Sequence, residues 1–427
     1  MSARRVRWSW YMYDWANSAF PTTVLTVLLG PYLTHVALRA ADASGRLSVL
    51  GLEIAADAYY PFLVSVSVVL QLLILPLAGA IADAWGRRKL LLLLFAYVGA
   101  AATVGLYWVE GDRYILGGVL FVVANLCFGA SIVMYNAFLP DIAAPHERDA
   151  VSSRGWAVGY AGGGTLLGLN LLFLSAAEHL GIATEHAVRL CLASAGVWWG
   201  IFTLIPAIGL PNVRQQWEGS RGYQHVSSSG IGFWETLRHL QGPAVLFLAA
   251  YFFYNDGVQT VIALSGQFAS RELGLPIQTI TGTLLAVQFV ALVGSLAFGM
   301  LAQRFGAKRV LLWSLGVWIG VLSYVALGLR SAEEFVVMAM LVGLVLGGTQ
   351  ALSRSLFSLY IPERREAQYF SLYELSDRGS SWMGPLLFGM VLQWSGSYRL
   401  SVAVIAALFG IGGILLAMLR YPLRSSK

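Results

Sequence analysis

Charge is the scarcest property of this 427-residue chain, because Asp, Glu, Lys and Arg together make up only 12% of it. Soluble domains carry about 25%. Hydrophobic residues make up 57% and gather in repeated stretches long enough to cross a bilayer, about 20 residues each. This composition excludes a soluble enzyme, a nucleic-acid-binding protein and a disordered chain. It predicts an integral, multi-pass membrane protein whose surroundings are the lipid bilayer.

Groups for catalysis or energy conversion are also missing. The two cysteines, Cys127 and Cys191, lie inside apolar stretches, so they indicate no disulfide framework. None of the six histidines pairs with a second ligand at metal spacing inside a span. The chain has no Gly-x-x-x-x-Gly-Lys phosphate loop, so ATP is not the expected energy source. We expect no enzyme, no metal site and no bound cofactor.

The apolar stretches predict twelve membrane-spanning helices, because segments of this length that are apolar nearly all round are helices in lipid. They lie near residues 11–37, 58–82, 89–109, 113–139, 154–177, 187–210, 242–268, 277–303, 308–329, 334–360, 368–394 and 398–421.

The distribution of Lys and Arg predicts that both termini are cytoplasmic. With that orientation most Lys and Arg residues lie in cytoplasmic segments, where these residues are usually enriched. Arg378 is the one basic residue assigned to a span. If bacterial, the protein belongs in the cytoplasmic (inner) membrane. The outward-facing loops hold only Arg39, Arg46, Arg113, Arg189, Arg271, Arg330 and Arg399.

The longest gap between spans divides the chain into two predicted bundles, residues 1–210 and 242–427. The gap itself, 211–241, contains Gly and Ser and predicts a cytoplasmic linker. Apolar residues at spacing three near its end, 231–241, indicate a short amphipathic helix on the inner leaflet. An ordinary connector explains them equally well.

The two halves repeat each other. The loop after the second span, Gly79 to Lys89, returns after the eighth span as Gly299 to Arg309, 220 residues later. Six spans, an even number, separate the copies, so the halves have the same orientation. Parallel six-helix halves are a layout of transporters that rock about a central site. The sequence therefore predicts an all-α membrane protein of two parallel six-helix pseudo-repeats.

Several motifs point to a known family. The chain resembles the major facilitator superfamily in its Gly79-x-x-x-Asp83-x-x-Gly86-Arg87-Arg88-Lys89 loop. Within it, the chain is similar to the vacuole-effluxer branch, the autophagy-related amino-acid effluxers and their bacterial relatives. The stretches that carry this second resemblance are Tyr13–Phe20, Tyr135–Pro140 with Gly155-Trp156, Tyr254–Gly257 and Gly347–Ser355.

The resemblance implies the major facilitator fold and secondary transport by alternating access, with the first and seventh helices lining a central cavity. It also implies a small-molecule cargo, amino-acid-like and moved outward, and we expect a monomer. Two departures argue against a drug/proton antiporter: the fourth span lacks the arginine that many of them carry, and the fifth lacks the proline of their Gly-Pro motif.

Two acids in the spans are candidates for the transport path. Asp14 in the first span and Asp256 in the seventh occupy pseudo-equivalent helices, and Asn17 and Gln259 follow three residues later on the same helix face. Ionisable residues in a span usually face a cavity or a partner. These acids could bind a substrate amine or carry a coupling proton. The alternative for Asp14 is structural, because an acid about one turn into a helix stabilises its positive end.

Neighbouring polar residues complete the predicted path: Tyr13, Tyr254, Asn255, Asn136 and Gln350. Single amides more often hold helices together than line a path. Glycines at spacing four, such as Gly316/Gly320 and Gly343/Gly347, are expected to let helices approach closely.

Two charged groups are candidate gates. The first is the loop motif, with Gly79, Asp83, Gly86, Arg87 and Arg88. Its carboxylate can sit against a neighbouring helix in one state and leave it in another, or it is merely a charged cytoplasmic turn. The second is Glu374 and Arg378 at spacing four, with Asp377 reaching Arg378 or a basic loop; the alternative is a structural pair.

Two other functions stay open. The chain could carry an amphipathic cargo such as a lysolipid or a cell-wall fragment, or it could be a membrane receptor or scaffold that no longer transports. The retained loop motif argues against the second, because a static protein has little use for a gate.

Overall fold

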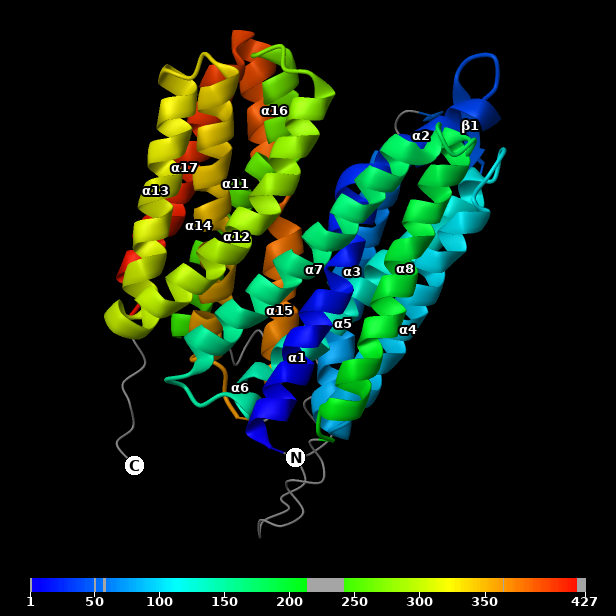
Figure 1. Cartoon of the computed structure of the whole chain (residues 1–427). Coiled ribbons are helices and arrows are strands. Elements are labelled where there is room, and N and C mark those ends of the chain that lie inside the picture. The colour runs from blue at the N-terminus through cyan, green and yellow to red at the C-terminus, as the bar shows by residue number, and fades with distance from the viewer. Residues whose placement is uncertain (1, 50, 57–58, 213–241, 364, 421–427) are drawn as a thin grey trace. The chain divides into compact units, whose positions relative to one another are not determined.

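The computed structural model describes residues 2–49, 51–56, 59–212, 242–363 and 365–420, and they are almost entirely helical (Figure 1). Among these residues, 11 helices are long and apolar enough to cross a membrane. Large apolar side chains such as Leu73, Leu172 and Leu327 lie exposed on them, which suits contact with lipid chains. The predicted multi-pass membrane protein is confirmed.

By their internal contacts the described residues form two compact units. Unit 1 comprises Met1–Tyr135 with Ala161–Val226, and unit 2 comprises Asn136–Tyr160 with Ser227–Lys427. The predicted bundles, 1–210 and 242–427, divide the chain by sequence repeat and stay a prediction. The predicted amphipathic helix at 231–241 lies outside the described residues.

Unit 1 packs its helices through glycines. A Cβ atom at Gly196 of α8 would lie 2.6 Å from the backbone oxygen of Ala100 in α4, so these two helices touch through their backbones. The elements of this unit are α1 (Ala3–Asn17), η1 (Phe20–Leu28), α2 (Leu29–Ala40), β1 (Arg46–Val49), β2 (Leu52–Ala55), α3 (Tyr59–Trp85), α4 (Arg88–Gly105), η3 (Leu106–Trp108), α5 (Tyr114–Ala137), the later part of α7 (Arg148–Ala177) and α8 (Thr184–Gly209).

The first predicted span, 11–37, is longer and less regular than expected. Helical structure runs from Ala3 to Ala40, but its middle part, η1, is a π-helix. Pro21 in η1 has no N–H to give to a regular ladder, and the Thr26 hydroxyl donates instead to the Pro21 carbonyl at 2.8 Å. π-Helical turns are rare in proteins, and those that occur are frequently found at functional sites.

A β-hairpin, which the sequence analysis did not predict, connects α2 to α3. Strands β1 and β2 pair antiparallel, with Arg46 opposite Ala55. Asp42 starts the hairpin by accepting hydrogen bonds from the backbone N–H groups of Ser44 and Arg46, at 2.8 and 2.9 Å. The bond from Arg46 is the main reason that the pKa of Asp42 lies below its usual range.

Unit 2 contains the tightest helix pair of the described chain, α12 with α14. A Cβ atom at Gly294 would lie 2.0 Å from the Leu344 oxygen, and one at Gly347 would lie 2.0 Å from the Ala291 oxygen. The elements are α6 (Leu139–Ile142), the start of α7, α11 (Gly242–Arg271), α12 (Ile277–Phe305), α13 (Ala307–Leu327), α14 (Ala332–Ser358), α15 (Glu366–Ser380), α16 (Met383–Ser395) and α17 (Tyr398–Met418).

The glycine predictions divide in two. Gly343 and Gly347 lie at a close helix contact, as expected. Gly316 and Gly320 do not, because a Cβ atom at either position would meet nothing within 4 Å. Spacing alone does not reveal which face of a helix meets a neighbour.

The eleventh predicted span, 368–394, is not one helix. It breaks at Ser381 and Trp382 into α15 and α16, which have 15 and 13 residues. Each is too short to cross a bilayer alone. The break leaves the last carbonyls of α15 and the first N–H groups of α16 in need of partners.

The repeated loops share several features in the two units. Gly86 (φ 62°) and Gly306 (φ 87°) both have a positive φ, which glycine tolerates best, and each donates its N–H four residues back, to Ala82 and Ala302. A lysine after each turn caps the end of a later helix: Lys89 donates to the Leu210 carbonyl at 2.7 Å, and Lys308 donates to the Leu419 carbonyl at 2.6 Å.

The α12–α14 contact yields a test. Gly347→Ala should lower the stability by about 1–3 kcal/mol, because the added methyl group overlaps a backbone carbonyl and the helices must separate. Gly316→Ala, the matched control, should leave the melting temperature unchanged or higher, since its methyl group meets nothing. Thermal unfolding of the purified variants measures both. Equal melting temperatures would contradict the contact.

Candidate functional site

Both units bury polar side chains on helices that the sequence predicts to cross the membrane. We call Trp10, Asp14 and Tyr135 the Asp14 cluster. The Glu374 cluster consists of Asn136, Arg354, Glu374 and Arg378, and the Asp377 cluster consists of Tyr251, Asn255, Gln350, Asp377 and Ser380. The first lies in unit 1 and the other two in unit 2.

The Asp14 cluster holds its carboxylate with an aromatic hydroxyl. Tyr135 donates to Oδ2 of Asp14 at 2.5 Å. The Tyr135 ring stacks on Trp10 with the centroids 4.3 Å apart, and Nε1 of Trp10 donates to the Tyr135 carbonyl at 2.9 Å. Asp14 is therefore a buried acid fixed in orientation by α5.

The structural alternative for Asp14 is wrong. Because α1 begins at Ala3 and ends at Asn17, Asp14 lies near the C-terminal end, where the helix dipole is negative. Tyr13 and Asn17 are also buried; the Tyr13 hydroxyl lies beside Ser131 and Trp199, whereas Nδ2 of Asn17 has no hydrogen-bond partner in the described chain. Buried polar atoms of this kind usually meet water or a ligand.

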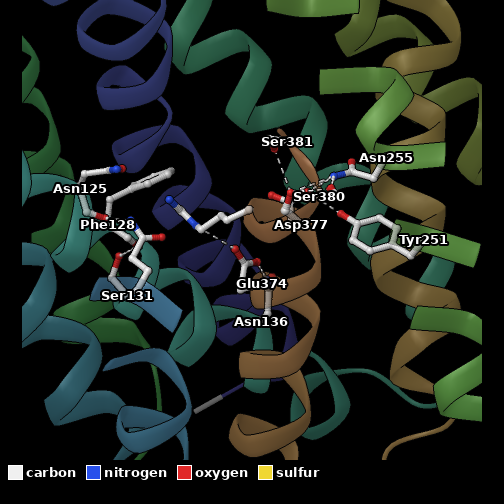
Figure 2. A network of polar contacts seen from close by, with 12 residues as sticks. Asn125, Phe128, Ser131, Asn136, Tyr251, Asn255, Glu374, Asp377, Ser380 and Ser381 are labelled. Atoms are coloured by element: carbon white, nitrogen blue, oxygen red, sulfur yellow. Dashed lines mark hydrogen bonds and ion pairs between the residues drawn. The ribbon is translucent and has the colours of Figure 1, made fainter. Parts of the chain in front are cut away.

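The Glu374 cluster contains the predicted pair of Glu374 and Arg378, whose Oε2 and Nε atoms lie 3.8 Å apart. The other carboxylate oxygen, Oε1, accepts a hydrogen bond from Nδ2 of Asn136 at 2.9 Å (Figure 2). A residue predicted for the path and two predicted for a gate therefore share one network.

Arg354 is the residue that the sequence analysis missed, since it assigned only Arg378 to a span. Arg354 lies in α14 and is 2% exposed. Its Nε and Nη2 donate to Oγ and the carbonyl of Ser152 at 2.9 and 2.8 Å, and Nη1 donates to Oδ1 of Asn136 at 3.3 Å. The guanidinium also lies 5.4 Å from the centre of the Trp156 ring. The available signal was a charged residue inside the predicted span 334–360.

The Asp377 cluster adds partners that the sequence analysis did not name. Asp377 is attracted by the charge of Arg378, and the hydrogen bonds to its carboxylate come from another helix. Its Oδ1 accepts hydrogen bonds from the Tyr251 hydroxyl and from Nδ2 of Asn255, both at 2.7 Å (Figure 2). Gln350 donates to Oδ1 of Asn255 at 3.4 Å. This cluster therefore also joins residues predicted for the path with a residue predicted for a gate.

Asp256 is fully buried but belongs to neither cluster of unit 2. Its Oδ2 lies 3.1 Å from the position of a Cβ atom at Gly384, so Asp256 faces the first turn of α16 while Asn255 faces α15. The polar contact of Asp256 in the part of the chain that the structure describes is with the backbone of Gly384, and no side chain there donates a hydrogen bond to it. Nearby on α11, the Tyr254 hydroxyl pairs with Oγ of Ser353 at 2.6 Å, and Gln259 is half-buried.

The loop motif forms an ion pair inside unit 1. Nη2 of Arg88 lies 2.8 Å from Oδ1 of Asp83, and both side chains are 6% exposed. Arg87 is exposed, whereas Gly79 is buried in α3. Arg88 rather than Arg87 therefore holds the carboxylate.

The comparisons with known proteins agree with these features. A family model described as "Vacuole effluxer Atg22 like" matches residues 2–422. The chain is 30% identical to the uncharacterized MFS-type transporter YxiO of Bacillus subtilis, over 96% of this chain and 93% of that protein. It is 27% identical to autophagy-related protein 22-1 of Emericella nidulans, over 84% and 75% of the two chains.

Among solved structures, the chain is similar to the proton:xylose symporter XylE of the major facilitator superfamily. The TM-score is 0.74 at 12% identity, over 97% of this chain and 95% of that one. At this identity the likeness concerns the fold.

The contacts of Arg354 yield a test. Arg354→Lys should destabilise the protein by about 1.5–3 kcal/mol, because an ammonium cannot reproduce the planar fork that reaches Ser152 and Asn136 together. Arg87→Lys, at an exposed position, is the matched control and should behave as wild type. Thermal unfolding in detergent compares them; a wild-type melting temperature for Arg354→Lys would contradict the role of these contacts.

Proposed function

Because the chain belongs to the vacuole effluxer Atg22-like family of the major facilitator superfamily, we propose that it exports a small polar, amino-acid-like metabolite by alternating access. Transport across the membrane follows from the family. The cargo, the outward direction and the coupling to protons are the parts that we propose.

The proposal includes twelve spans with both termini in the cytoplasm. The helices α15 and α16 together have the length of one span, and the break between them lies beside buried polar residues. Interrupted helices in transporters expose backbone groups to ions and substrates in the same way. The protein would act as a monomer, in the cytoplasmic membrane if the host is bacterial.

The observation that supports a polar cargo best is the presence of both signs of charge inside unit 2. Arg354 and Arg378 supply positive charge, while Glu374 and Asp377 supply negative charge. Charges in a membrane are costly and mark substrate or ion paths. A zwitterion such as an amino acid carries complementary groups for both signs, whereas an amphipathic cargo would favour apolar walls.

Proton coupling is supported by Asp256. Ionisable side chains buried in membrane spans are costly and mark ion paths, and Asp256 is such a carboxylate in a predicted span. A conformational change that admits water to Asp256 would release its proton. The Asp83–Arg88 pair and the Glu374–Arg378 pair are the proposed gates, each able to break when its neighbouring helices shift.

Transport by reconstituted protein tests the cargo and the coupling. Liposomes loaded with labelled amino acids, and in parallel with labelled lysolipid, should lose amino acid faster when a pH gradient is imposed. Asp256→Asn should transport without the pH dependence, because an amide cannot take up a proton in this range. Asp112→Asn, in an exposed loop, should behave as wild type.

Three outcomes would count against the proposal. Normal transport by Asp256→Asn with an unchanged pH dependence would remove Asp256 from the coupling. Loss of lysolipid but not of amino acid would favour the amphipathic cargo. No flux of any compound, from protein with a wild-type melting temperature, would favour a receptor or scaffold.

A further inference from the structure

Three oxygen atoms at the end of α15 surround a single nitrogen. Nδ2 of Asn255 lies 2.7 Å from Oδ1 of Asp377, 3.3 Å from the Asp377 carbonyl oxygen and 3.5 Å from Oγ of Ser380 (Figure 2). All three oxygens belong to the last turn before the break at Ser381 and Trp382. They converge on a group from another helix, α11.

The amide matches this set of oxygens poorly. An Asn side chain has two N–H donors and no charge, whereas the three acceptors include an ionisable carboxylate. The C-terminal end of a helix also carries partial negative charge, which favours a cation. Tyr251, Asn255 and Gln259, the side chains that form hydrogen bonds with the Asp377 carboxylate, are all neutral. The charge of Arg378 attracts Asp377, but it attracts Glu374 as well, so Asp377 shares this cation with a second carboxylate.

A primary ammonium group matches the same oxygens better. It has three donors and one positive charge, like the head of a lysine side chain, and hydrogen bonds to charged groups are the stronger ones. We propose that Asp377 and Ser380 form the subsite for a primary ammonium group of the cargo, and that the amide of Asn255 occupies this subsite in the present structure. The proposal rests on the proposed function, because it assigns the ammonium group to the transported molecule.

The contacts around Asn255 allow an ammonium group to replace its amide. Tyr251 holds Oδ1 of Asp377 at 2.7 Å, and its ring stacks on Tyr373 with the centroids 4.4 Å apart, so the acceptor side is fixed. Among the described residues, the amide of Asn255 is otherwise held by Gln350 through a long bond of 3.4 Å. A rotation of the Asn255 side chain would remove its contacts to the three oxygens without moving α15, while Tyr251, Ser380 and Ser381 keep their hydrogen bonds to Asp377.

The subsite predicts which compounds bind. The purified full-length protein would be screened by thermal shift with the proteinogenic amino acids. The amino acid that shifts the melting temperature most would then be compared with its N-acetyl form, its deaminated acid and its decarboxylated amine. The free amino acid and the amine should stabilise the folded protein by mass action. The acetylated and deaminated compounds should not, because they lack the ammonium group.

Variants assign this selectivity to the proposed residues. Asp377→Asn should weaken the affinity for the amine by about ten- to a hundredfold, and Asp377→Glu should restore part of it. Asn255→Ala should bind the amine at least as tightly as wild type, because the competing amide is gone. Asp112→Asn is the matched acid control on an exposed loop. Melting temperatures without ligand identify any variant that fails to fold.

The outcomes separate this inference from the proposed function. If the Asp377→Asn protein folds and keeps the wild-type preference for amines, or if no primary amine shifts the melting temperature of wild type, the subsite is wrong. Flux of amino acids with an unaltered preference in Asp377→Asn would overturn the subsite and leave the transporter standing. Amine binding that depends on Asp377, in protein that moves none of these compounds, would support the subsite and overturn the transport proposal.

Discussion

A charge inside an apolar helix must find its partners within the protein, because hydrocarbon offers neither hydrogen bonds nor counter-ions. The interior of unit 2 is organised by this constraint. Arg354 donates to Ser152 and Asn136, and Asn136 in turn donates to Glu374, which pairs with Arg378. One continuous set of donors and acceptors therefore joins the end of α5, the start of α7, α14 and α15. Removing any member would leave a buried polar group without its partner, which is the costly case in a low dielectric.

Interrupted helices give these polar groups a second use. In η1 the proline cannot donate to the backbone ladder, and the Thr26 hydroxyl donates to the Pro21 carbonyl. Between α15 and α16 the Asp377 carbonyl accepts hydrogen bonds from Asn255, Ser380 and Ser381. Side chains near a break form hydrogen bonds with backbone groups that have no helical partner. The same side chains are then in position to form hydrogen bonds with a ligand instead. This is why the polar residues of unit 2 gather beside its broken helix.

Local geometry was predictable where it depends on neighbouring residues. The repeated loop motif marked corresponding positions in the two halves, and Gly86 and Gly306 both have a positive φ. The Glu374–Arg378 pair followed from spacing on one helix. Partners from other helices were not predictable in this way: the hydrogen bonds of Asp377 with Tyr251 and Asn255 were not foreseen, and Gly316 and Gly320 were expected at a contact but face open space. Which face of a span turns inward depends on helix rotation, and the nearly uniform hydropathy of these spans carries little information about it.

The sequence by itself determined the class of this protein, most of its long apolar helices, its internal repeat and its family. These properties follow from the length and apolarity of segments and from motifs whose residues are adjacent in the chain. Only the tertiary structure decided that Arg354 is a buried charge, that Asp14 lies near the end of α1, that Asp256 faces α16, and that Asn255 lies within three oxygens of α15. Those facts depend on where helices break and how they rotate against each other. Both are set by packing and by the need of each buried polar group for a partner, which arises only when distant segments meet.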